Sequence, residues 1–265
     1  MQQRIRVAIA GAAGKMGLET VRTVALQDDM ELVGAVDPNR EGEDIGTIAT
    51  GAPLHVTCVP SIADLAEARP DVLVDFTTPS LVKANALQAL SMGIRPVIGT
   101  TGMSTNDLQD LDDAALSRAL GLIVAPNFAI GAILLMKFAQ QAARYFGNAE
   151  IIELHHNRKA DAPSGTAIKT AEMMLDVRDA FGLDDAPETE KVKGARGGDF
   201  GGIHIHSVRL PGLVAHQEVI FGGVGQTLTI RHDSLSRESF MPGVSLAIRK
   251  APEFKGLVYG LEHLL

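Results

Sequence analysis

A cluster of histidine, lysine and hydroxyl side chains occurs near the middle of the chain. His155 and His156 are adjacent, and Lys159 follows in the same short segment. Imidazole has an unperturbed pKa of about 6.5, the nearest to neutrality among side chains, and lysine is a compact cation with transferable protons. Adjacent strand residues point to opposite faces, so the two histidines should have different roles, and no metal site is expected. These residue types indicate proton transfer.

The same segment ends in Ser164-Gly165-Thr166, which closes a loop and opens an expected helix. The N–H groups of a helix N-terminus and the neighbouring hydroxyls form a ready site for a carboxylate. Together with the two cations before it, this helix start predicts a small anionic substrate with more than one carboxylate. The alternative is a solvated loop in which Asp161 acts as a cap and Pro163 stiffens the backbone.

A glycine-rich loop near the N-terminus is a second candidate site. Residues 4–10 read as a strand and run directly into Gly11-Ala12-Ala13-Gly14-Lys15-Met16-Gly17. Glycines here allow a sharp turn and a close approach of the backbone to a pyrophosphate, and the next helix supplies unpaired N–H donors. The spacing is G-x-x-G-x-x-G rather than G-x-G-x-x-G, and a simple packing turn is the alternative.

Asp37 supports the dinucleotide interpretation, because it ends the second expected strand twenty residues beyond Gly17. A carboxylate at this point can accept hydrogen bonds from the ribose hydroxyls of the adenosine, which favours NAD. Arg40 and Lys15 are close enough in sequence to offset the repulsion of a 2′-phosphate. The expected cofactors are therefore NADH, NADPH or both, with NAD favoured.

Two later loops also follow expected parallel strands, where open α/β sheets bind ligands. Gly99-Thr100-Thr101-Gly102 comes after residues 95–98, and Ala125-Pro126-Asn127-Phe128 comes after residues 122–125. Each loop could contact a nicotinamide through its backbone and small side chains. Taken alone, each could be a simple turn.

The elements that must position these residues form two groups. Up to residue 127, β-rich runs alternate with amphipathic stretches, which predicts an α/β fold with a Rossmann-type doubly wound parallel sheet. After residue 127, consecutive β-rich runs with short turns predict a second α+β domain on a mixed or antiparallel sheet. We expect a dinucleotide-binding domain of residues 1–127 with 240–265 and a second domain of residues 128–239, with the helix at 237–250 packing back on the first. The expected strands are 4–10, 31–36, 72–75, 95–98, 122–125, 149–155, 203–210, 215–221 and 226–231; the expected helices are 15–27, 62–67, 81–92, 105–119, 129–145, 166–177 and 237–250; residues 184–200 are expected to form an exposed flexible loop.

Composition excludes several classes of protein. The chain has 265 residues, and its 24 Lys+Arg against 32 Asp+Glu give a formal net charge of −8, which disfavours nucleic acid and anionic membranes as partners. The single cysteine, Cys58, permits neither an internal disulfide nor a multi-thiolate metal site, and should be a small buried residue. Pro126-Asn127 interrupts the apolar segment 120–136, and the N-terminus does not fit a signal peptide. A cytoplasmic protein without a membrane span is expected.

Several motifs resemble one enzyme family in the same order along the chain. Residues 153–167 read ELHHNRKADAPSGTA, which is similar to the signature of the 4-hydroxy-tetrahydrodipicolinate reductase (dihydrodipicolinate reductase) family of the diaminopimelate and lysine pathway. Residues 11–17, the Asp-Phe-Thr at 75–77, and residues 99–102 and 125–128 also resemble that family. The resemblance therefore covers most of the chain.

The resemblance implies an NAD(P)H-dependent oxidoreductase that reduces 4-hydroxy-tetrahydrodipicolinate to tetrahydrodipicolinate with loss of water. It implies that His155 is the catalytic histidine and Lys159 the proton donor, and that residues 128–239 form a substrate-binding and oligomerisation domain of a homotetramer. Many members carry Glu followed by Arg where this chain has Asp37-Pro38, which leaves the NADH or NADPH preference open. The implied substrate-binding residues are His156, Gly165 and Thr166, and the expected cofactor-binding residues are Gly11, Ala12, Ala13, Gly14, Lys15, Met16, Asp37, Arg40, Gly99, Thr100, Thr101, Ala125, Pro126, Asn127 and Phe128.

The expected reaction is a hydride transfer from C4 of the nicotinamide to an unsaturated cyclic dicarboxylate, with a proton from Lys159 or His155 as the two domains close. Two alternatives remain open. One is another two-domain amino-acid-pathway dehydrogenase, related to aspartate or homoserine dehydrogenase. The other is a non-catalytic dinucleotide-binding sensor, which would have no use for His155 and Lys159 together.

Overall fold

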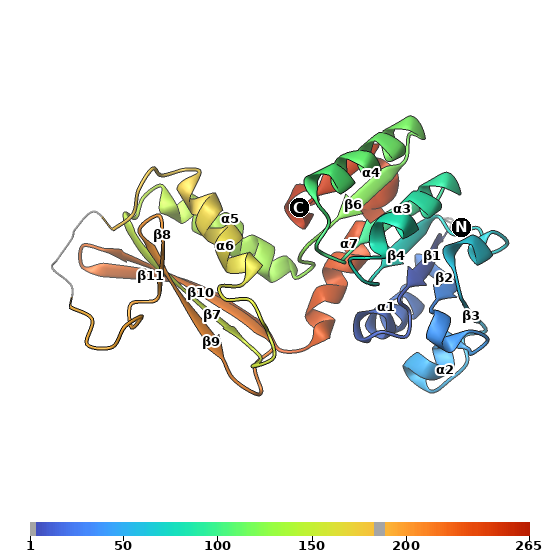
Figure 1. Ribbon diagram of the computed structural model, residues 1–265, viewed down its shortest axis with the longest axis horizontal. Helices are drawn as coiled ribbons and strands as arrows, with labels where there is room; N and C mark the ends of the chain where they lie inside the picture. The colour runs from blue at the N-terminus through green and yellow to red at the C-terminus, as the bar shows by residue number, and fades with distance from the viewer. Residues whose placement is uncertain (1–3, 183–188) are drawn as a thin grey trace. The chain divides into compact units, whose positions relative to one another are not determined.

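The computed structural model describes residues 4–182 and 189–265, and the chain divides into two compact units (Figure 1). Unit 1 extends to Phe128 and resumes at Phe240, and unit 2 spans Ala129–Ser239. The first part of the predicted loop at 184–200 lies outside the described residues. No helix in the described part of the chain is long and apolar enough to cross a membrane.

Unit 1 contains a seven-stranded sheet whose described neighbours are all parallel. The chain moves from β1 to β2 and β3 on one side, and then to β4, β5 and β6 on the other. The order therefore reverses at the β1/β4 boundary, and this is the doubly wound, Rossmann-type sheet that the sequence predicts. In the order β12-β6-β5-β4-β1-β2-β3, the strands are β1 (Ile5–Ala10), β2 (Met30–Val36), β3 (Cys58–Val59), β4 (Val72–Asp75), β5 (Arg95–Ile98), β6 (Gly121–Val124) and β12 (Gly256–Tyr259).

Helices bury apolar faces against this sheet. Val82, Ala86 and Leu90 of α3 pack with Leu111 of α4 and Ile98 of β5 in one fully buried cluster. α7 packs against α1 and β1 within unit 1. The helices of this unit are α1 (Lys15–Ala25), α2 (Ile45–Thr50), α3 (Val82–Ser91), α4 (Thr105–Ser117) and α7 (Met241–Lys250), with short 3-10 helices η1 (Pro38–Arg40), η2 (Ile62–Leu65), η4 (Ala251–Glu253) and η5 (Leu261–His263).

Unit 2 is a five-stranded sheet with α5 and α6 on one face (Figure 1). β7 and β9 are parallel and the other described pairs are antiparallel, which confirms the predicted mixed sheet. Along β7, Ala149, Ile151 and Glu153 are buried, so a carboxylate occupies the third inward position. The elements are α5 (Ile130–Ala143), β7 (Asn148–His155), α6 (Gly165–Leu175), β8 (Gly198–Phe200), β9 (Ile203–Arg209), β10 (Ala215–Gly223) and β11 (Gln226–Ser234), in the sheet order β11-β10-β7-β9-β8, followed by the 3-10 helix η3 (Arg237–Phe240).

The structure corrects the prediction at several short elements. Gly198–Phe200 is not loop but the edge strand β8, because its backbone pairs with β9 although its composition is that of a turn. α2, β3 and β12 were not predicted, and the helix expected at 62–67 is only the 3-10 helix Ile62–Leu65. The apolar segment 120–136 contains the whole of β6 (Gly121–Val124) and the first half of α5, with a break between them, and Cys58 is buried in β3, as predicted.

Candidate active site

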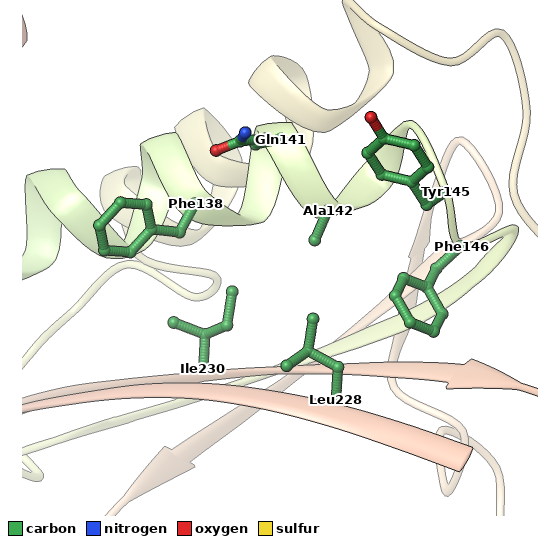
Figure 2. Close-up of a pocket in the computed structure, with 7 residues that line it drawn as sticks. All are labelled: Phe138, Gln141, Ala142, Tyr145, Phe146, Leu228 and Ile230. Atoms are coloured by element: carbon green, nitrogen blue, oxygen red, sulfur yellow. The ribbon is translucent and has the colours of Figure 1, made fainter.

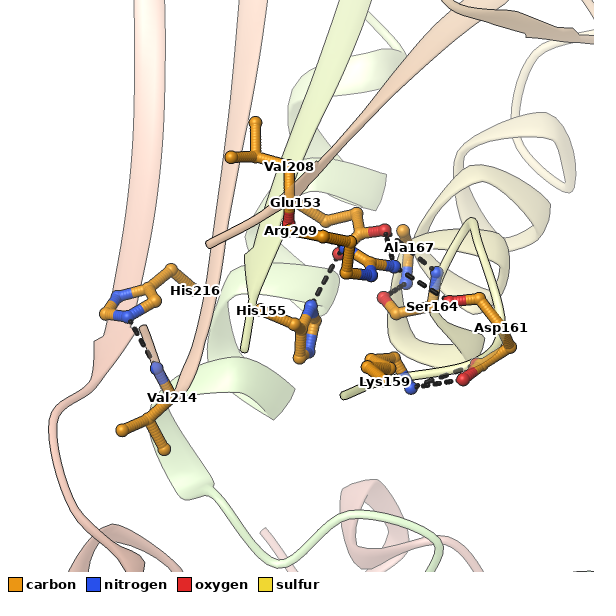
Figure 3. Close-up of polar contacts among 10 residues, drawn as sticks. All are labelled: Glu153, His155, Lys159, Asp161, Ser164, Ala167, Val208, Arg209, Val214 and His216. Carbon is orange, nitrogen blue, oxygen red and sulfur yellow. Dashed lines mark hydrogen bonds and ion pairs between the residues drawn. The ribbon is translucent and has the colours of Figure 1, made fainter. Parts of the chain in front are cut away.

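The carboxylate of Glu153 is the centre of one cluster of polar contacts in unit 2 (Figure 3). Glu153 is completely buried. Arg209 donates two hydrogen bonds to it, at 2.8 Å to Oε2 and 2.6 Å to Oε1. The backbone N–H of Ser164 donates to Oε1 at 3.2 Å, and Nδ1 of His155 lies 2.5 Å from Oε2. These donors compensate the loss of water around a buried anion.

The ionisation of Glu153 fixes the proton on His155. Burial raises the pKa of Glu153, but hydrogen bonds with His155, Arg209 and Ser207 outweigh it and lower the pKa to about 2. A carboxylate that is ionised at neutral pH can only accept, so the contact is an Nδ1–H donating to Oε2. The Nε2 of His155 is then the ring nitrogen that remains for a ligand.

Lys159 lies in the loop between β7 and α6 and is tied to the same network. Its ammonium group lies 2.8 Å from Oδ1 and 2.9 Å from Oδ2 of Asp161. This hydrogen bond lowers the pKa of Asp161. Nη2 of Arg209 also donates to the backbone carbonyl of Asp161 at 2.9 Å. The Arg209 guanidinium therefore joins the Lys159 loop to the carboxylate that holds His155.

The start of α6 provides the third part of this site. Ser164 is the buried N-cap, and its Oγ accepts the N–H of Ala167 at 3.2 Å. The first turn of α6 contains no acidic residue, so the positive end of the helix dipole is not neutralised from within. Gly165 is exposed, and a Cβ at this position would meet open space among the described residues. A carboxylate can approach the backbone here.

The structure brings together His155, Lys159 and the helix start at Gly165, and His156 follows directly after the end of β7 with its side chain exposed. Sequence reasoning gave no role to Glu153 and did not single out Arg209, which lies 56 residues away along the chain. The sequence does contain a signal for Glu153. A carboxylate at an inward position of an amphipathic strand requires a buried partner.

The other predicted residues lie at the carboxyl ends of the strands of unit 1. Because these strands are parallel, the loops that follow β1, β2, β5 and β6 emerge at one edge of the sheet. Backbone hydrogen bonds connect them: Gly11 donates to Val36 O at 2.9 Å, and Ala125 donates to Ile98 O at 2.9 Å. The predicted residues at this edge are 11–16 after β1, Asp37 and Arg40 after β2, 99–101 after β5 and 125–128 after β6.

Two glycine positions of the loop are packed too closely for any side chain. Gly11 has φ +72°, and a Cβ there would lie 2.7 Å from the carbonyl oxygen of Phe76. A Cβ at Gly17 would lie 2.1 Å from the carbonyl oxygen of Gly11. Gly14 is the N-cap of α1 and offers no capping side chain, and the first turn contains no acidic residue. The first N–H groups of α1 are therefore suited to an anion.

Asp37 lies against this loop. It is 8% exposed, and its carboxylate accepts the N–H groups of Ala13 and Asn39, both at 3.1 Å. Arg40 is exposed and pairs with Glu43 at 3.3 Å. The carboxylate of Asp37 thus lies beside the glycine loop, whereas Glu43 partly neutralises the guanidinium of Arg40.

Asp75, in the Asp-Phe-Thr motif, joins the loops that follow β4 and β5, a role that sequence reasoning did not assign. Asp75 is 1% exposed. Its carboxylate accepts hydrogen bonds from the backbone N–H of Thr77 at 2.9 Å, from Nδ2 of Asn85 at 2.8 Å and from Oγ1 of Thr100 at 3.3 Å. The adjacent Phe76 ring lies where a Cβ on Gly99 would be, at 2.2 Å. A side chain at position 99 would therefore force the Phe76 ring to move.

A separate pocket of about 420 Å³ occurs in unit 2 beside α5 and β11 (Figure 2). None of its lining residues carries a carboxylate, an imidazole or a cationic group, so it offers nothing to balance an anionic substrate. We therefore place the candidate active site at the Glu153 network and not here. The pocket is lined by Phe138, Gln141, Ala142, Tyr145, Phe146, Leu228 and Ile230.

Both units are similar to known reductases. The family described as "Dihydrodipicolinate reductase, N-terminus" matches residues 5–128, and "Dihydrodipicolinate reductase, C-terminus" matches residues 131–265. The 4-hydroxy-tetrahydrodipicolinate reductase of Desulfitobacterium hafniense is 56% identical over 265 residues, which cover 99% of each chain. That of Moorella thermoacetica is 54% identical over 262 residues, which cover 98% of each chain.

Solved structures give the same result. A dipicolinate-bound dihydrodipicolinate reductase from Paenisporosarcina has a TM-score of 0.88 and 49% sequence identity, covering 99% of this chain and 100% of that one. An amine dehydrogenase from Mycobacterium smegmatis, at a TM-score of 0.67 and 14% identity, shares the fold alone.

The glycine loop gives a first prediction, for Gly17→Ala. Alanine has a higher helix propensity than glycine, by about 1 kcal/mol, so the substitution would stabilise α1 if there were space for a Cβ at position 17. Because the added Cβ would collide with the Gly11 carbonyl, we expect a lower unfolding temperature and an NADH dissociation constant at least about tenfold higher. Fluorescence titration and thermal unfolding measure the two effects.

Gly222→Ala in β10 is the matched control, because its nearest neighbour atom, Cβ of Asn148, is 3.9 Å away. It should leave NADH binding unchanged. A Gly17→Ala variant with unchanged NADH affinity and a raised unfolding temperature would contradict the close packing of the loop.

Proposed function

The chain belongs to the dihydrodipicolinate reductase family, and from this we propose that it reduces 4-hydroxy-tetrahydrodipicolinate to tetrahydrodipicolinate with NADH or NADPH, releasing water. The relatives at 56% and 54% identity carry the name of that activity over nearly their whole length. The reaction belongs to diaminopimelate and lysine biosynthesis. One substrate molecule, one hydride and one proton give one product molecule and one water.

One observation supports this function above the others. A single segment, residues 155–166, combines an imidazole oriented by a buried carboxylate, an ammonium group and a helix start suited to a carboxylate. A cyclic dicarboxylate needs anion-binding groups at two points and a proton donor near the ring. The Paenisporosarcina reductase is bound to dipicolinate, itself a dicarboxylate, which agrees with this chemistry.

We assign roles in unit 2 from these contacts. The N–H groups and hydroxyl at Gly165 and Thr166 bind one substrate carboxylate, and His156 contributes a second polar contact. Lys159 donates the proton that the reduced ring requires, and His155 presents Nε2 to the substrate while Nδ1 is held by Glu153. A well-placed general acid contributes about 10²- to 10⁴-fold in rate.

In unit 1 we assign the loops at the carboxyl edge to the nicotinamide dinucleotide, which supplies the hydride when bound. The backbone of residues 11–16 holds the pyrophosphate, and Asp37 accepts hydrogen bonds from the adenosine ribose. Residues 99–101 and 125–128 surround the nicotinamide end. Unit 1 is then the dinucleotide-binding domain, and unit 2 the substrate-binding domain.

We further propose that NADH is preferred over NADPH. The buried Asp37 carboxylate is an acceptor for a ribose 2′-hydroxyl and repels a 2′-phosphate. Arg40 could attract such a phosphate, but it pairs with Glu43 at 3.3 Å. The charge near the ribose therefore favours the cofactor without the additional phosphate.

One face of the unit 2 sheet has no helix against it among the described residues, and this supports assembly of a homotetramer. α5 and α6 cover the inward face, whereas Ile152, Leu154, Val208 and Ile220 lie on the outward one and are partly buried within the sheet itself. Burying such side chains against a second copy is favourable. We place the tetramer interface on this face and the enzyme in the cytoplasm, where its single buried thiol stays reduced.

The function is tested by the loss of NADH absorbance with substrate generated from aspartate semialdehyde and pyruvate. Stoichiometric oxidation that requires both precursors is the expected result. A sensor would bind NADH without oxidising it, and a relative of aspartate or homoserine dehydrogenase would instead use aspartate or homoserine as its substrate. Either outcome would contradict the proposed function.

A second prediction concerns Lys159→Ala. Loss of the proton donor should lower kcat by about 100-fold or more while the NADH dissociation constant stays unchanged, because Lys159 belongs to unit 2. Lys169→Ala on the exposed side of α6 removes the same group from a pair at 4.0 Å with Glu172 and should leave both values unchanged. Full turnover in Lys159→Ala would rule out its role.

A third prediction concerns Asp37→Asn, which keeps an acceptor for Ala13 but removes the negative charge. We expect kcat/KM for NADPH relative to NADH to rise about tenfold, equivalent to about 1.4 kcal/mol. Asp113→Asn, on the exposed surface of α4, is the control. The cofactor proposal fails if the ratio for Asp37→Asn remains that of the unchanged protein.

A further inference from the structure

We propose that the buried ion pair of Glu153 and Arg209 is a positioning device for the reaction, which fixes the His155 ring and the substrate-binding loop in one arrangement. Neither residue needs to touch the substrate. The inference rests on the proposed function, because it supposes that His155 and Lys159 act on a bound substrate.

The first step is the orientation of His155. A neutral imidazole has two tautomers, and a ring at the end of a strand can also rotate by half a turn. Glu153 precedes His155 by two residues, so both side chains lie on the same face of β7. The contact of Nδ1 with Oε2 therefore selects one rotamer and one tautomer, as the carboxylate does for histidine in catalytic triads.

The second step is the orientation of Glu153 itself. Arg209 stands opposite His155 in the parallel register of β7 and β9, and its two Nη groups engage both carboxylate oxygens. A bidentate pair of this kind fixes the plane of the carboxylate. The guanidinium also balances the buried negative charge, so the carboxylate acts as an oriented acceptor and not as an isolated anion.

The third step is the connection to the substrate-binding loop. Oε1 of Glu153 accepts the N–H of Ser164, the residue that caps α6. Arg209 donates to the backbone of Asp161, whose side chain holds Lys159. One ion pair thus sets three parts of the site: the imidazole, the loop of the ammonium group and the helix start.

A second cluster of the same composition provides a contrast. Glu150, on the same strand, lies 2.7 Å from Nε2 of His206 and 2.7 Å from Arg196. Its side chain is 35% exposed, whereas that of Glu153 is fully buried, and it engages the opposite ring nitrogen of its histidine. His206 is therefore an internal reference for the state of His155.

The experiment combines kinetics with NMR of the histidine rings. In the full-length protein, a long-range ¹H–¹⁵N spectrum at mildly alkaline pH should show the proton of His155 on Nδ1. In Glu153→Gln we expect that preference to be lost, with kcat lowered by about 100-fold or more and NADH affinity unchanged. The signals of His206 should not change. Glu172→Gln, on the exposed side of α6, is the control for the substitution itself.

Two further variants distinguish a loss of positioning from a loss of folding. Glu153→Asp keeps the negative charge but moves the carboxylate away from His155. Arg209→Lys keeps the positive charge but removes the guanidinium that binds both carboxylate oxygens. Both variants should fold, and both should have a lower kcat with an unchanged NADH dissociation constant. If Glu153→Gln proves unstable, these variants and the spectrum of the unchanged protein decide the question.

Two results would overturn the inference while leaving the proposed function in place. They are a His155 ring protonated on Nε2 in the unchanged protein, and wild-type kcat in Glu153→Gln when His155→Ala is inactive. Wild-type turnover in both His155→Ala and Lys159→Ala would instead refute the proposed roles of those residues, and the positioning inference with them.

Discussion

The buried carboxylate of Glu153 imposes the constraint on which the candidate active site of unit 2 depends. Transfer of an ionised group from water into a protein interior is expensive unless hydrogen-bond donors and a counter-charge replace the water. Here Arg209, His155 and the backbone of Ser164 do so. These donors come from three segments of the chain. The requirement to satisfy one anion therefore brings β7, β9 and the start of α6 into a single arrangement.

A steric constraint has the corresponding role in unit 1. The glycine loop approaches the Phe76 carbonyl and its own α1 so closely that a single added carbon would collide at Gly11 or Gly17. Asp75 then joins the loops after β4 and β5 through Thr77, Asn85 and Thr100. The same edge of the parallel sheet thus presents the start of α1, which has no side-chain cap, and closely packed backbone, the two features on which the proposed dinucleotide site rests.

How much of this can be predicted from sequence depends on how local the determinant is. The strands β1, β4 and β5 and the helix α1 were predicted because apolar runs and glycine turns mark them within a few residues. β3 has two residues and β8 three, too few for any periodicity, and they exist because a neighbouring strand pairs with them. The candidate site residues of the segment 155–166 could be predicted for the same reason, because they lie close together along the chain. The pairing of Glu153 with Arg209 was not, because it depends on the parallel register of two strands 56 residues apart.

The central claim, that hydride passes from a nicotinamide to the ring of a cyclic dicarboxylate held by this chain, has a direct isotopic test. NADH carrying deuterium at both C4 positions is mixed in a single turnover with freshly generated substrate, and the ring product is analysed by mass spectrometry. The account predicts one deuterium in each product molecule and an equal amount of oxidised dinucleotide. A product without deuterium, or NADH that binds and stays reduced in the presence of substrate, would contradict it.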